Sequence, residues 1–322
     1  MRAIVFEQSG QPEDVLSLKE IPPPIPQSGQ VLIKVVARPI QPADFLFIGG
    51  RYRIKPVFPQ PAGLEGTGTI VDCAPEITHL KKGMRVAFRS PGAWAEFAVA
   101  PASRVYPVPA DVPDDIAGQF ALNPITAWGL LSECNLQPSS RILITAGRSI
   151  VARLLTQLAR HKGLEVTLLV REKGGYTALN GNNNQVIANG ATVAETLQDA
   201  VKNGHFHAIL DSVGGADSLA LMDALESRGR LVSYGILSDT DITIRASRVL
   251  LKNLIWQGFG IDGWLDNATA EQIEAAQNEL WALLLRYPEL LPVTSRFDLS
   301  QIQEAVRATY GTHSPGKVMF VG

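Results

Sequence analysis

The chain has 322 residues, of which 46% are hydrophobic and 19% charged, and its net charge is -2. This length predicts two domains, and this composition excludes a disordered chain. The near-neutral charge excludes non-specific attraction to nucleic acid or to an acidic membrane. No apolar run approaches the roughly 20 residues that span a bilayer, and the short apolar stretch after Met1 does not resemble a signal peptide. We expect a soluble, cytoplasmic protein with no nucleic-acid partner and no membrane partner.

Proline placement divides the chain. Sixteen of the 21 prolines lie at or before Pro113, and the next proline after Pro138 is Pro288. Because proline lacks an N–H and interrupts helices and central strands, the first region should hold short strands, turns and loops. Strand patterns at 31–37, 66–71 and 95–99 favour a small β-barrel or sandwich there.

The middle region alternates between strand and helix periodicity. Apolar strand patterns lie at 141–145, 165–170, 185–188, 207–210 and 230–234, with helical patterns such as 150–160 and 218–226 between them. This alternation predicts an α/β domain with a doubly wound parallel sheet, covered on both faces by right-handed crossovers. The last 55 residues differ, with helical patterns at 270–285 and 302–310 and a terminal strand at 317–321.

The turn after the first strand of the middle region is a candidate phosphate-binding loop. Laid on the pattern G-x-G-x-x-G, Gly147 keeps the first glycine, Ser149 replaces the second and Ala152 the third. The backbone N–H groups of such a turn and of the following helix bind a dinucleotide pyrophosphate. Ser149 is a departure, so the motif alone fits an ordinary strand-to-helix turn equally well.

The end of the second strand indicates which dinucleotide would bind. An NAD site needs an acidic residue there to accept from the ribose 2′-hydroxyl, whereas this chain has Arg171, followed by Lys173. A guanidinium suits a 2′-phosphate, which favours NADPH as the cofactor. The alternative is a solvated charge at a strand end, and Glu172 between the two cations counts mildly for it.

Metal chemistry has little support in the sequence. Cys73 and Cys134 cannot form a disulfide framework or a four-thiolate zinc site. His205 and His207 lie close together, but no cysteine or carboxylate pair follows at ligand spacing, so we interpret them as residues at the start of a strand. We expect no bound metal.

Several motifs in one order resemble the medium-chain dehydrogenase/reductase superfamily over the full length of the chain. They are residues 41–44 (QPAD), 49–52 (GGRY), 63–66 (GLEG), 123–128 (NPITAW), 170–171 (VR), 211–215 (DSVGG), 234–237 (YGIL) and 254–264. Within that superfamily the chain looks like the 2-enoyl thioester reductases, with the zinc-independent quinone oxidoreductases as nearest neighbours. The resemblance implies a GroES-like β-barrel-type catalytic domain at 1–120, a Rossmann NADPH-binding domain at 121–265 and a C-terminal return to the catalytic domain at 266–322.

The resemblance also implies functional residues. Tyr52 matches the catalytic tyrosine, which would protonate the substrate or stabilise its enolate. The cofactor-binding residues implied by the motifs are Asn123, Thr126, Gly147, Arg148, Ser149, Ile150, Val151, Arg171, Lys173, Tyr234, Gly235, Ile236, Leu237, Phe259, Gly260, Ile261 and Lys317. A homodimer joined through the nucleotide-binding sheets is implied as well.

The chain departs from the patterns of the superfamily at five places. Gln41 and Leu64 stand where zinc alcohol dehydrogenases have a cysteine and a histidine, and the four-cysteine lobe is absent between Val99 and Val108. Gly260 replaces a tryptophan of the acyl pocket. Ala152 replaces the usual glycine of the phosphate loop, which weakens the expected cofactor contact.

Three functions stay open on this evidence. The first is NADPH-dependent reduction of a 2-enoyl thioester by hydride transfer to the β-carbon, with coenzyme A or an acyl carrier protein contacting Arg51, Arg53 and Lys55. The second is a zinc-independent quinone or enone oxidoreductase, which needs no specific proton donor. The third is an NADPH-binding protein without turnover.

Overall fold

The computed structural model describes residues 1–310 and 316–322, and the chain divides into two compact units. The first unit comprises Met1–Pro124 and Gln277–Gly322, and the second comprises Ile125–Ala276. No described helix is both long enough and apolar enough to cross a membrane.

The first unit is built on β-strands, as the proline-rich sequence predicts. Its larger sheet has the order β16-β17-β3-β5-β6-β8, with β7 also paired to β3, and a smaller sheet has the order β2-β1-β4. The strands are β1 (Arg2–Phe6), β2 (Ser17–Glu20), β3 (Gln30–Ile40), β4 (Gln60–Pro61), β5 (Glu65–Cys73), β6 (Arg85–Arg89), β7 (Phe97–Pro101), β8 (Val105–Pro107), β16 (Val293–Phe297) and β17 (Lys317–Val321). Short helices α1 (Pro12–Val15), α2 (Pro42–Ile48), α3 (Asp114–Ala117) and α11 (Ile302–Thr309) complete the unit.

The C-terminal segment completes the sheet that the first hundred residues begin. Strand β17 pairs antiparallel with β3, with Val318 opposite Ile40 and Phe320 opposite Arg38. Val318, Met319 and Phe320 are all buried, and Val318 and Phe320 belong to the core cluster of this unit. The predicted terminal strand at 317–321 is confirmed.

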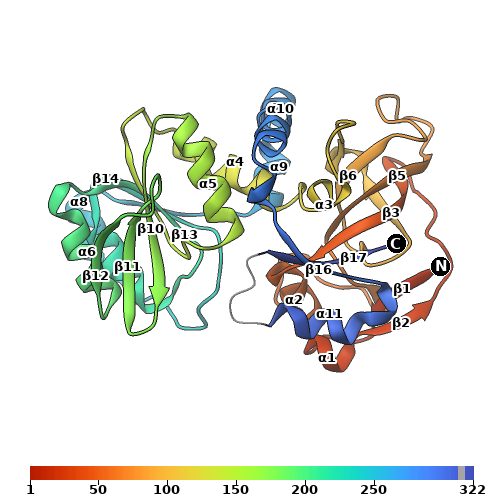
Figure 1. The fold of residues 1–322 in the computed structure, drawn as a ribbon, viewed down its shortest axis with the longest axis horizontal. Helices are drawn as coiled ribbons and strands as arrows, with labels where there is room; N and C mark the ends of the chain where they lie inside the picture. The colour runs from red at the N-terminus through yellow and green to blue at the C-terminus, as the bar shows by residue number, and fades with distance from the viewer. Residues whose placement is uncertain (311–315) are drawn as a thin grey trace. The chain divides into compact units, whose positions relative to one another are not determined.

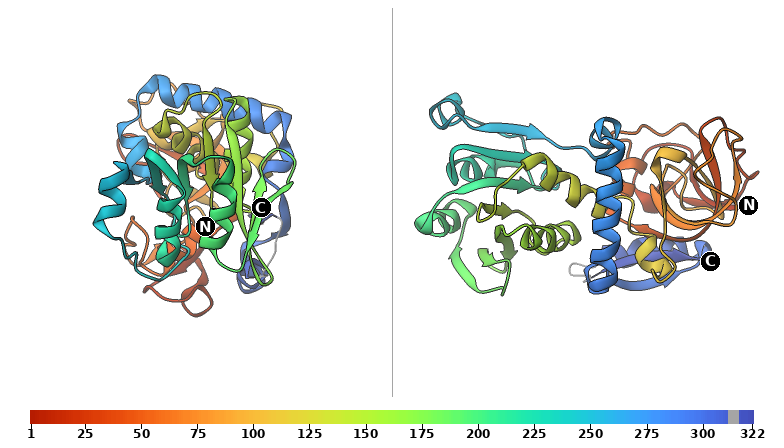
Figure 2. Two further views of the ribbon diagram at one scale, coloured as in Figure 1. Left: turned by 90° about the vertical axis from the view of Figure 1, so that its left-hand side faces the viewer. Right: turned by 90° about the horizontal axis from the view of Figure 1, so that it is seen from above.

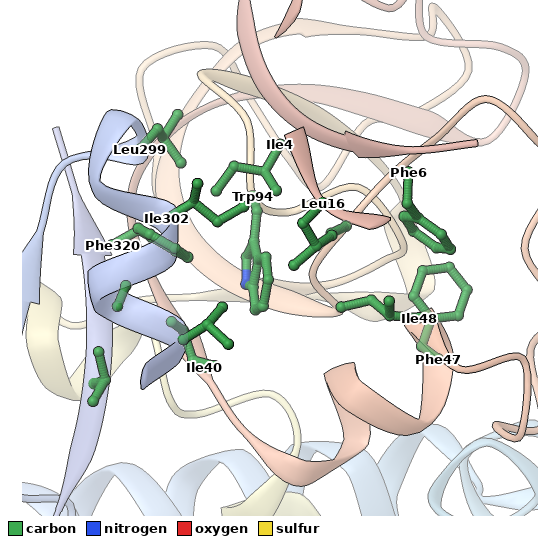
Figure 3. Packing of buried hydrophobic residues seen from close by; sticks show 14 of the residues in the cluster. Ile4, Phe6, Leu16, Ile40, Phe47, Ile48, Trp94, Leu299, Ile302 and Phe320 are labelled. Carbon is green, nitrogen blue, oxygen red and sulfur yellow. The ribbon is translucent and has the colours of Figure 1, made fainter. Parts of the chain in front are cut away.

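Trp94 lies at the centre of the core of the first unit (Figure 3). It is fully buried, its Nε1 donates to the Pro39 carbonyl at 3.0 Å, and its ring meets Phe320 edge-on at 5.2 Å. Ile4 and Ile302 pack against the same cluster from strand β1 and helix α11. The indole therefore joins three separate parts of the chain while its one polar group stays hydrogen-bonded.

The second unit is a seven-stranded sheet of order β12-β11-β10-β9-β13-β14-β15. The strands are β9 (Arg141–Ile144), β10 (Glu165–Glu172), β11 (Gly175–Asn180), β12 (Val186–Gly190), β13 (Phe206–Asp211), β14 (Leu225–Ser233) and β15 (Ile255–Gly258). The helices of this unit include α5 (Ile150–His161), α6 (Val193–Ala200), α7 (Ser218–Asp223), α8 (Ala246–Lys252) and α9 (Ile261–Asn267). Figure 1 shows α6 and α8 on one side of the strands and α5 on the other, which confirms the predicted doubly wound α/β class.

One strand contradicts the prediction of a purely parallel sheet. Strand β11 is antiparallel to both β10 and β12, and it replaces the helical crossover expected after the second strand. Glu172 pairs with Gly175 across a turn in which Gly174 has φ +91°, a conformation that favours glycine. The sequence GG therefore reverses the chain, and a second turn at 181–185 leads into β12, whereas the connections from β9 to β10 and from β12 onward contain helices.

Two helices contain the points where the chain passes from one unit to the other. Helix α4 (Asn123–Cys134) contains the first, and helix α10 (Ala270–Arg286) contains the second. Figure 2 shows α10 as one uninterrupted helix, in agreement with the helical pattern predicted at 270–285.

Candidate functional site

The predicted phosphate loop lies between β9 and α5 in the second unit. Ala146 adopts a left-handed conformation with φ +47°, which is uncommon for a residue with a side chain. A Cβ atom on Gly147 would lie 2.8 Å from Leu168 Cβ and 3.0 Å from Val170 Cγ1. The loop therefore passes so close to β10 that only glycine fits at position 147, as a dinucleotide-binding turn requires.

Ser149 fits the loop without the second glycine of the motif. Its φ is -68°, so this position needs no glycine for its backbone conformation. Its Oγ accepts a hydrogen bond from the Ala152 N–H at 3.2 Å and thereby caps α5. Arg148, Ile150 and Val151 flank this N-terminus, where exposed N–H groups favour an anion.

The end of β10 presents its charged residues on opposite faces of the strand. Leu168 and Val170 point toward Gly147, and strand alternation places Glu172 on that same face. The Glu172 carboxylate forms an ion pair with Arg148 of the phosphate loop. Arg171 lies on the other face, opposite Tyr176 of β11, and Lys173 lies in the turn that follows.

The ends of β13 and β14 are tied to the same edge of the sheet. The buried Asp211 accepts from the Thr145 hydroxyl at 2.7 Å and from the Val213 and Gly214 N–H groups at 3.0 Å. The Tyr234 N–H donates to the Asp211 carbonyl at 2.8 Å. Burial raises the pKa of the Tyr234 phenol, so this group stays protonated.

The residues after Tyr234 lie at this edge. A Cβ on Gly235 would lie 2.5 Å from the Ser212 carbonyl oxygen, so this position also requires glycine. Ile236 and Leu237 are 63% and 61% exposed.

The remaining predicted cofactor residues of the second unit lie near α4 and α9. The Phe259 N–H donates to the Ser233 carbonyl at 2.8 Å, which places the end of β15 beside the end of β14. Gly260 is the N-cap of α9, and Ile261 is buried. Thr126 is nearly buried in the first turn of α4.

Tyr52 lies in the first unit and is held by an arginine. The Arg89 Nη2 donates to the Tyr52 hydroxyl oxygen at 2.9 Å, and the guanidinium carbon lies 5.9 Å from the ring centroid. Arg89 ends strand β6 and is 3% exposed, so its charge acts in a largely dry environment. Tyr52 and Ile54 pack against the core, while Arg51, Arg53 and Lys55 alternate with them and are exposed.

A cluster of polar side chains, called here the buried polar cluster, lies in the same unit. It consists of the buried Gln41, Asp44, Glu65 and Arg89 and the half-buried Lys317. The Gln41 Nε2 donates to Glu65 Oε1 at 2.8 Å, and the Gln41 N–H donates to Asp44 Oδ2 at 2.9 Å. The Lys317 ammonium donates to Gln41 Oε1 at 3.4 Å. Asn123, at the edge of this cluster, donates to the same oxygen at 3.4 Å.

Burial dominates the electrostatics of the buried polar cluster. It raises the pKa of Asp44 to about 8 and that of Glu65 to about 7, although the nearby Lys317 and Arg89 charges oppose both shifts. Burial likewise lowers the pKa of Lys317, against the attraction of Glu65 and Asp44. Asp44 Oδ1 and Glu65 Oε2 accept no hydrogen bond from the residues that the structure describes. Burial therefore brings the pKa values of the two carboxyl groups close to neutral pH.

The two positions at which zinc alcohol dehydrogenases have a cysteine and a histidine hold Gln41 and Leu64 in this chain. Gln41 makes the hydrogen bonds given above, and Leu64 is buried in the core. Within residues 1–310 and 316–322, no three His, Cys, Asp or Glu side chains converge as metal ligands.

Five residues of the sites described above were not among the predicted site residues: Gln41, Asp44, Glu65, Arg89 and Glu172. Four of them have a sequence signal. Gln41 and Asp44 lie in the motif 41–44, Glu65 lies in the motif 63–66, and Glu172 lies between Arg171 and Lys173. Arg89 looks like an ordinary charged residue until the fold buries it.

Comparison with known proteins identifies the family. Residues 27–110 match the alcohol dehydrogenase GroES-like domain, and residues 151–277 match the zinc-binding dehydrogenase domain. Human mitochondrial enoyl-[acyl-carrier-protein] reductase is 28% identical over 318 residues, covering 96% of this chain and 85% of that protein. Among solved structures, a mycobacterial protein complexed with NADPH has a TM-score of 0.84 at 25% identity and covers 100% of both chains.

Escherichia coli quinone oxidoreductase, also complexed with NADPH, has a TM-score of 0.79 at 21% identity over 100% of both chains, a likeness in fold. The predicted pairing of a GroES-like domain with a Rossmann-type domain is confirmed. The chain belongs to the medium-chain dehydrogenase/reductase superfamily and is an NAD(P)-dependent oxidoreductase of the enoyl reductase and quinone oxidoreductase type.

Proposed function

We propose that this protein reduces the activated double bond of a 2-enoyl thioester with NADPH, and that Tyr52 is the catalytic residue. The observation that supports this most is the 2.9 Å hydrogen bond from Arg89 to the Tyr52 hydroxyl. It orients the hydroxyl and places a buried positive charge beside it. The enoyl-[acyl-carrier-protein] reductases among its relatives support the same substrate class.

The chemistry requires one hydride and one proton for each double bond. When bound, the reduced nicotinamide supplies the hydride to the β-carbon, and negative charge develops on the thioester oxygen. We propose that the Tyr52 hydroxyl donates to that oxygen or protonates the α-carbon, with the Arg89 charge stabilising the hydroxyl as its proton leaves. Arg51, Arg53 and Lys55 are exposed around it, which supports a phosphate-bearing carrier such as coenzyme A or an acyl carrier protein.

We propose the phosphate loop of the second unit as the NADPH site. The close packing of Gly147 against β10 and the N-terminus of the 12-residue helix α5 are both features of a pyrophosphate-binding turn. The Arg148 cation in this loop and Lys173 in the turn after β10 support NADPH over NADH, whereas Arg171 lies on the opposite face of the strand. Relatives crystallised with NADPH support the same cofactor.

Quinone or enone reduction is the second candidate. It is favoured by the resemblance in fold to quinone oxidoreductase. A quinone can take its protons from water, so this activity does not depend on Tyr52.

Turnover of crotonyl-CoA and of 1,4-naphthoquinone with NADPH, in wild type and Tyr52→Phe, tests these proposals. Loss of one proton donor costs about a hundred- to a thousand-fold in rate, so we expect that decrease with crotonyl-CoA and a far smaller one with naphthoquinone. Tyr310→Phe removes a hydroxyl from an exposed tyrosine of the same unit and serves as the matched control. Crotonyl-CoA turnover within about threefold of wild type in Tyr52→Phe would refute the role of Tyr52, and turnover of naphthoquinone alone would favour the second candidate.

We also propose a homodimer formed through β15. This strand lies at the edge of the seven-stranded sheet, with Ile255 and Trp256 43% and 44% exposed. An edge strand with apolar side chains is suited to pairing with a second copy. Light scattering should show a dimer for wild type and a monomer for Ile255→Lys, and a wild-type monomer at micromolar concentration would refute this.

A further inference from the structure

A carboxylate lies among the cations that are expected to bind the 2′-phosphate of NADPH. Glu172 follows Arg171 directly and precedes Lys173, and its Oε1 forms an ion pair with Arg148 Nη2. Arg148 lies between Gly147 and Ser149, in the loop that leads into α5. Glu172 therefore binds a cation of the phosphate loop directly.

A buried hydroxyl holds this carboxylate in place. The Thr177 Oγ1 donates to Glu172 Oε2 at 3.2 Å, and Thr177 is only 5% exposed. Thr177 comes from β11, the antiparallel strand that stands where a helical crossover was expected. Each oxygen of this carboxylate thus has its own donor, with the Arg148 and Glu172 side chains 64% and 42% exposed.

The direction of the Glu172 side chain places it at the cofactor side of the sheet. Leu168 and Val170 lie against Gly147, and residue 172 continues this alternation. In dinucleotide-binding sheets an acidic residue at the end of the second strand accepts from the ribose 2′-hydroxyl of NADH. Glu172 has the chemistry of that residue, although Arg171 precedes it.

We propose that Glu172 is a specificity-determining residue that limits the preference for NADPH, an inference that rests on the proposed cofactor site. The 2′-phosphate of NADPH needs Arg148, and Glu172 already occupies that guanidinium. NADH has a 2′-hydroxyl instead of this phosphate. The hydroxyl can donate a hydrogen bond to the Glu172 carboxylate while the carboxylate keeps its ion pair with Arg148. Binding of NADPH therefore includes the loss of the Arg148–Glu172 pair, and binding of NADH does not.

Two adenosine nucleotides that differ only in the 2′-phosphate test this directly. The dissociation constants of 2′,5′-ADP and 5′-AMP would be measured by calorimetry for wild type, Glu172→Gln, Arg148→Gln and the double variant. Glu165→Gln removes a carboxylate from the start of the same strand and is the matched control. Binding is the readout, so no turnover is needed.

We expect Glu172→Gln to bind 2′,5′-ADP about five- to tenfold more tightly, and 5′-AMP no more tightly, than wild type, since the Arg148 guanidinium is then released from its carboxylate partner and can bind the 2′-phosphate. In the Arg148→Gln background the gain should fall below about twofold, and Glu165→Gln should resemble wild type. An unchanged ratio of the two affinities in Glu172→Gln, or a full gain without Arg148, would overturn the inference. Failure of every variant and of wild type to bind 2′,5′-ADP would instead refute the proposed NADPH site, and this inference with it.

Discussion

Lys317 offers a test of the buried polar cluster in the first unit. Its ammonium lies 3.4 Å from Gln41 Oε1 and is attracted by the buried carboxyls of Glu65 and Asp44. Lys317→Met keeps the length of the side chain and removes its charge. The remaining Glu65 carboxylate would then be buried beside Gln41 without this ammonium.

The loss of unfolding free energy caused by Lys317→Met depends on pH, because burial raises the pKa of Glu65 to about 7. At pH 8 Glu65 is mainly ionised, and loss of the partner of a buried charge costs about 3–5 kcal/mol of unfolding free energy. At pH 5 Glu65 is neutral in the folded protein, so Lys317 lacks that partner and its removal should cost little. The Glu65 carboxyl holds its proton more tightly in the folded protein than in the unfolded chain, so the unfolding free energy falls as the pH rises toward 7. Lys317→Met removes a charge that lowers the pKa of Glu65, so the fall should continue to higher pH.

Urea unfolding at pH 5 and pH 8 would measure the two effects. Glu65→Gln should restore most of the stability of Lys317→Met at pH 8, because the unpaired charge is then absent. Lys34→Met, at an exposed position of β3, is the control for loss of a lysine. An equal loss of unfolding free energy in Lys317→Met at both pH values would refute the pairing of Lys317 with Glu65. Normal stability combined with weak NADPH binding would instead assign Lys317 to the cofactor.

Three further substitutions test the framework of the proposed cofactor site. Gly147→Ala should lower the unfolding free energy by about 1–3 kcal/mol, because its Cβ would lie 2.8 Å from Leu168 Cβ; unchanged stability in urea would contradict the close approach. Ser149→Ala removes the cap of α5 and should cost about 1 kcal/mol, measured in the same way, whereas a gain in stability would show that the cap is not made. Asp211→Ala removes the acceptor of three hydrogen bonds and should cost at least about 3 kcal/mol, while Asp211→Asn should cost less; equal losses would contradict the hydrogen-bond assignment.

The order of the elements and the family were readable from the sequence. Proline density separated the β-rich region from the α/β region, since proline is excluded from helix interiors and central strands for reasons local to each residue. The alternation of strand and helix periods likewise predicted the doubly wound sheet, and the terminal strand at 317–321 was predicted where β17 lies. Gly147 was identified from the loop pattern, whereas the contact with Leu168 that requires glycine there and the capping role of Ser149 became visible only in the structure.

Contacts between residues far apart in the sequence could be identified only from the tertiary structure. No rule of sequence spacing relates β17 to β3, or Arg89 to Tyr52, which the fold brings into contact. The burial of Asp44 likewise depends on the residues that the fold places around it. The antiparallel β11 was missed because its register depends on the neighbouring strands β10 and β12 rather than on its own periodicity. Local propensity and periodicity act over a few residues, whereas burial and pairing depend on the whole fold, and these determine the charge environment of Glu65, Lys317 and Glu172.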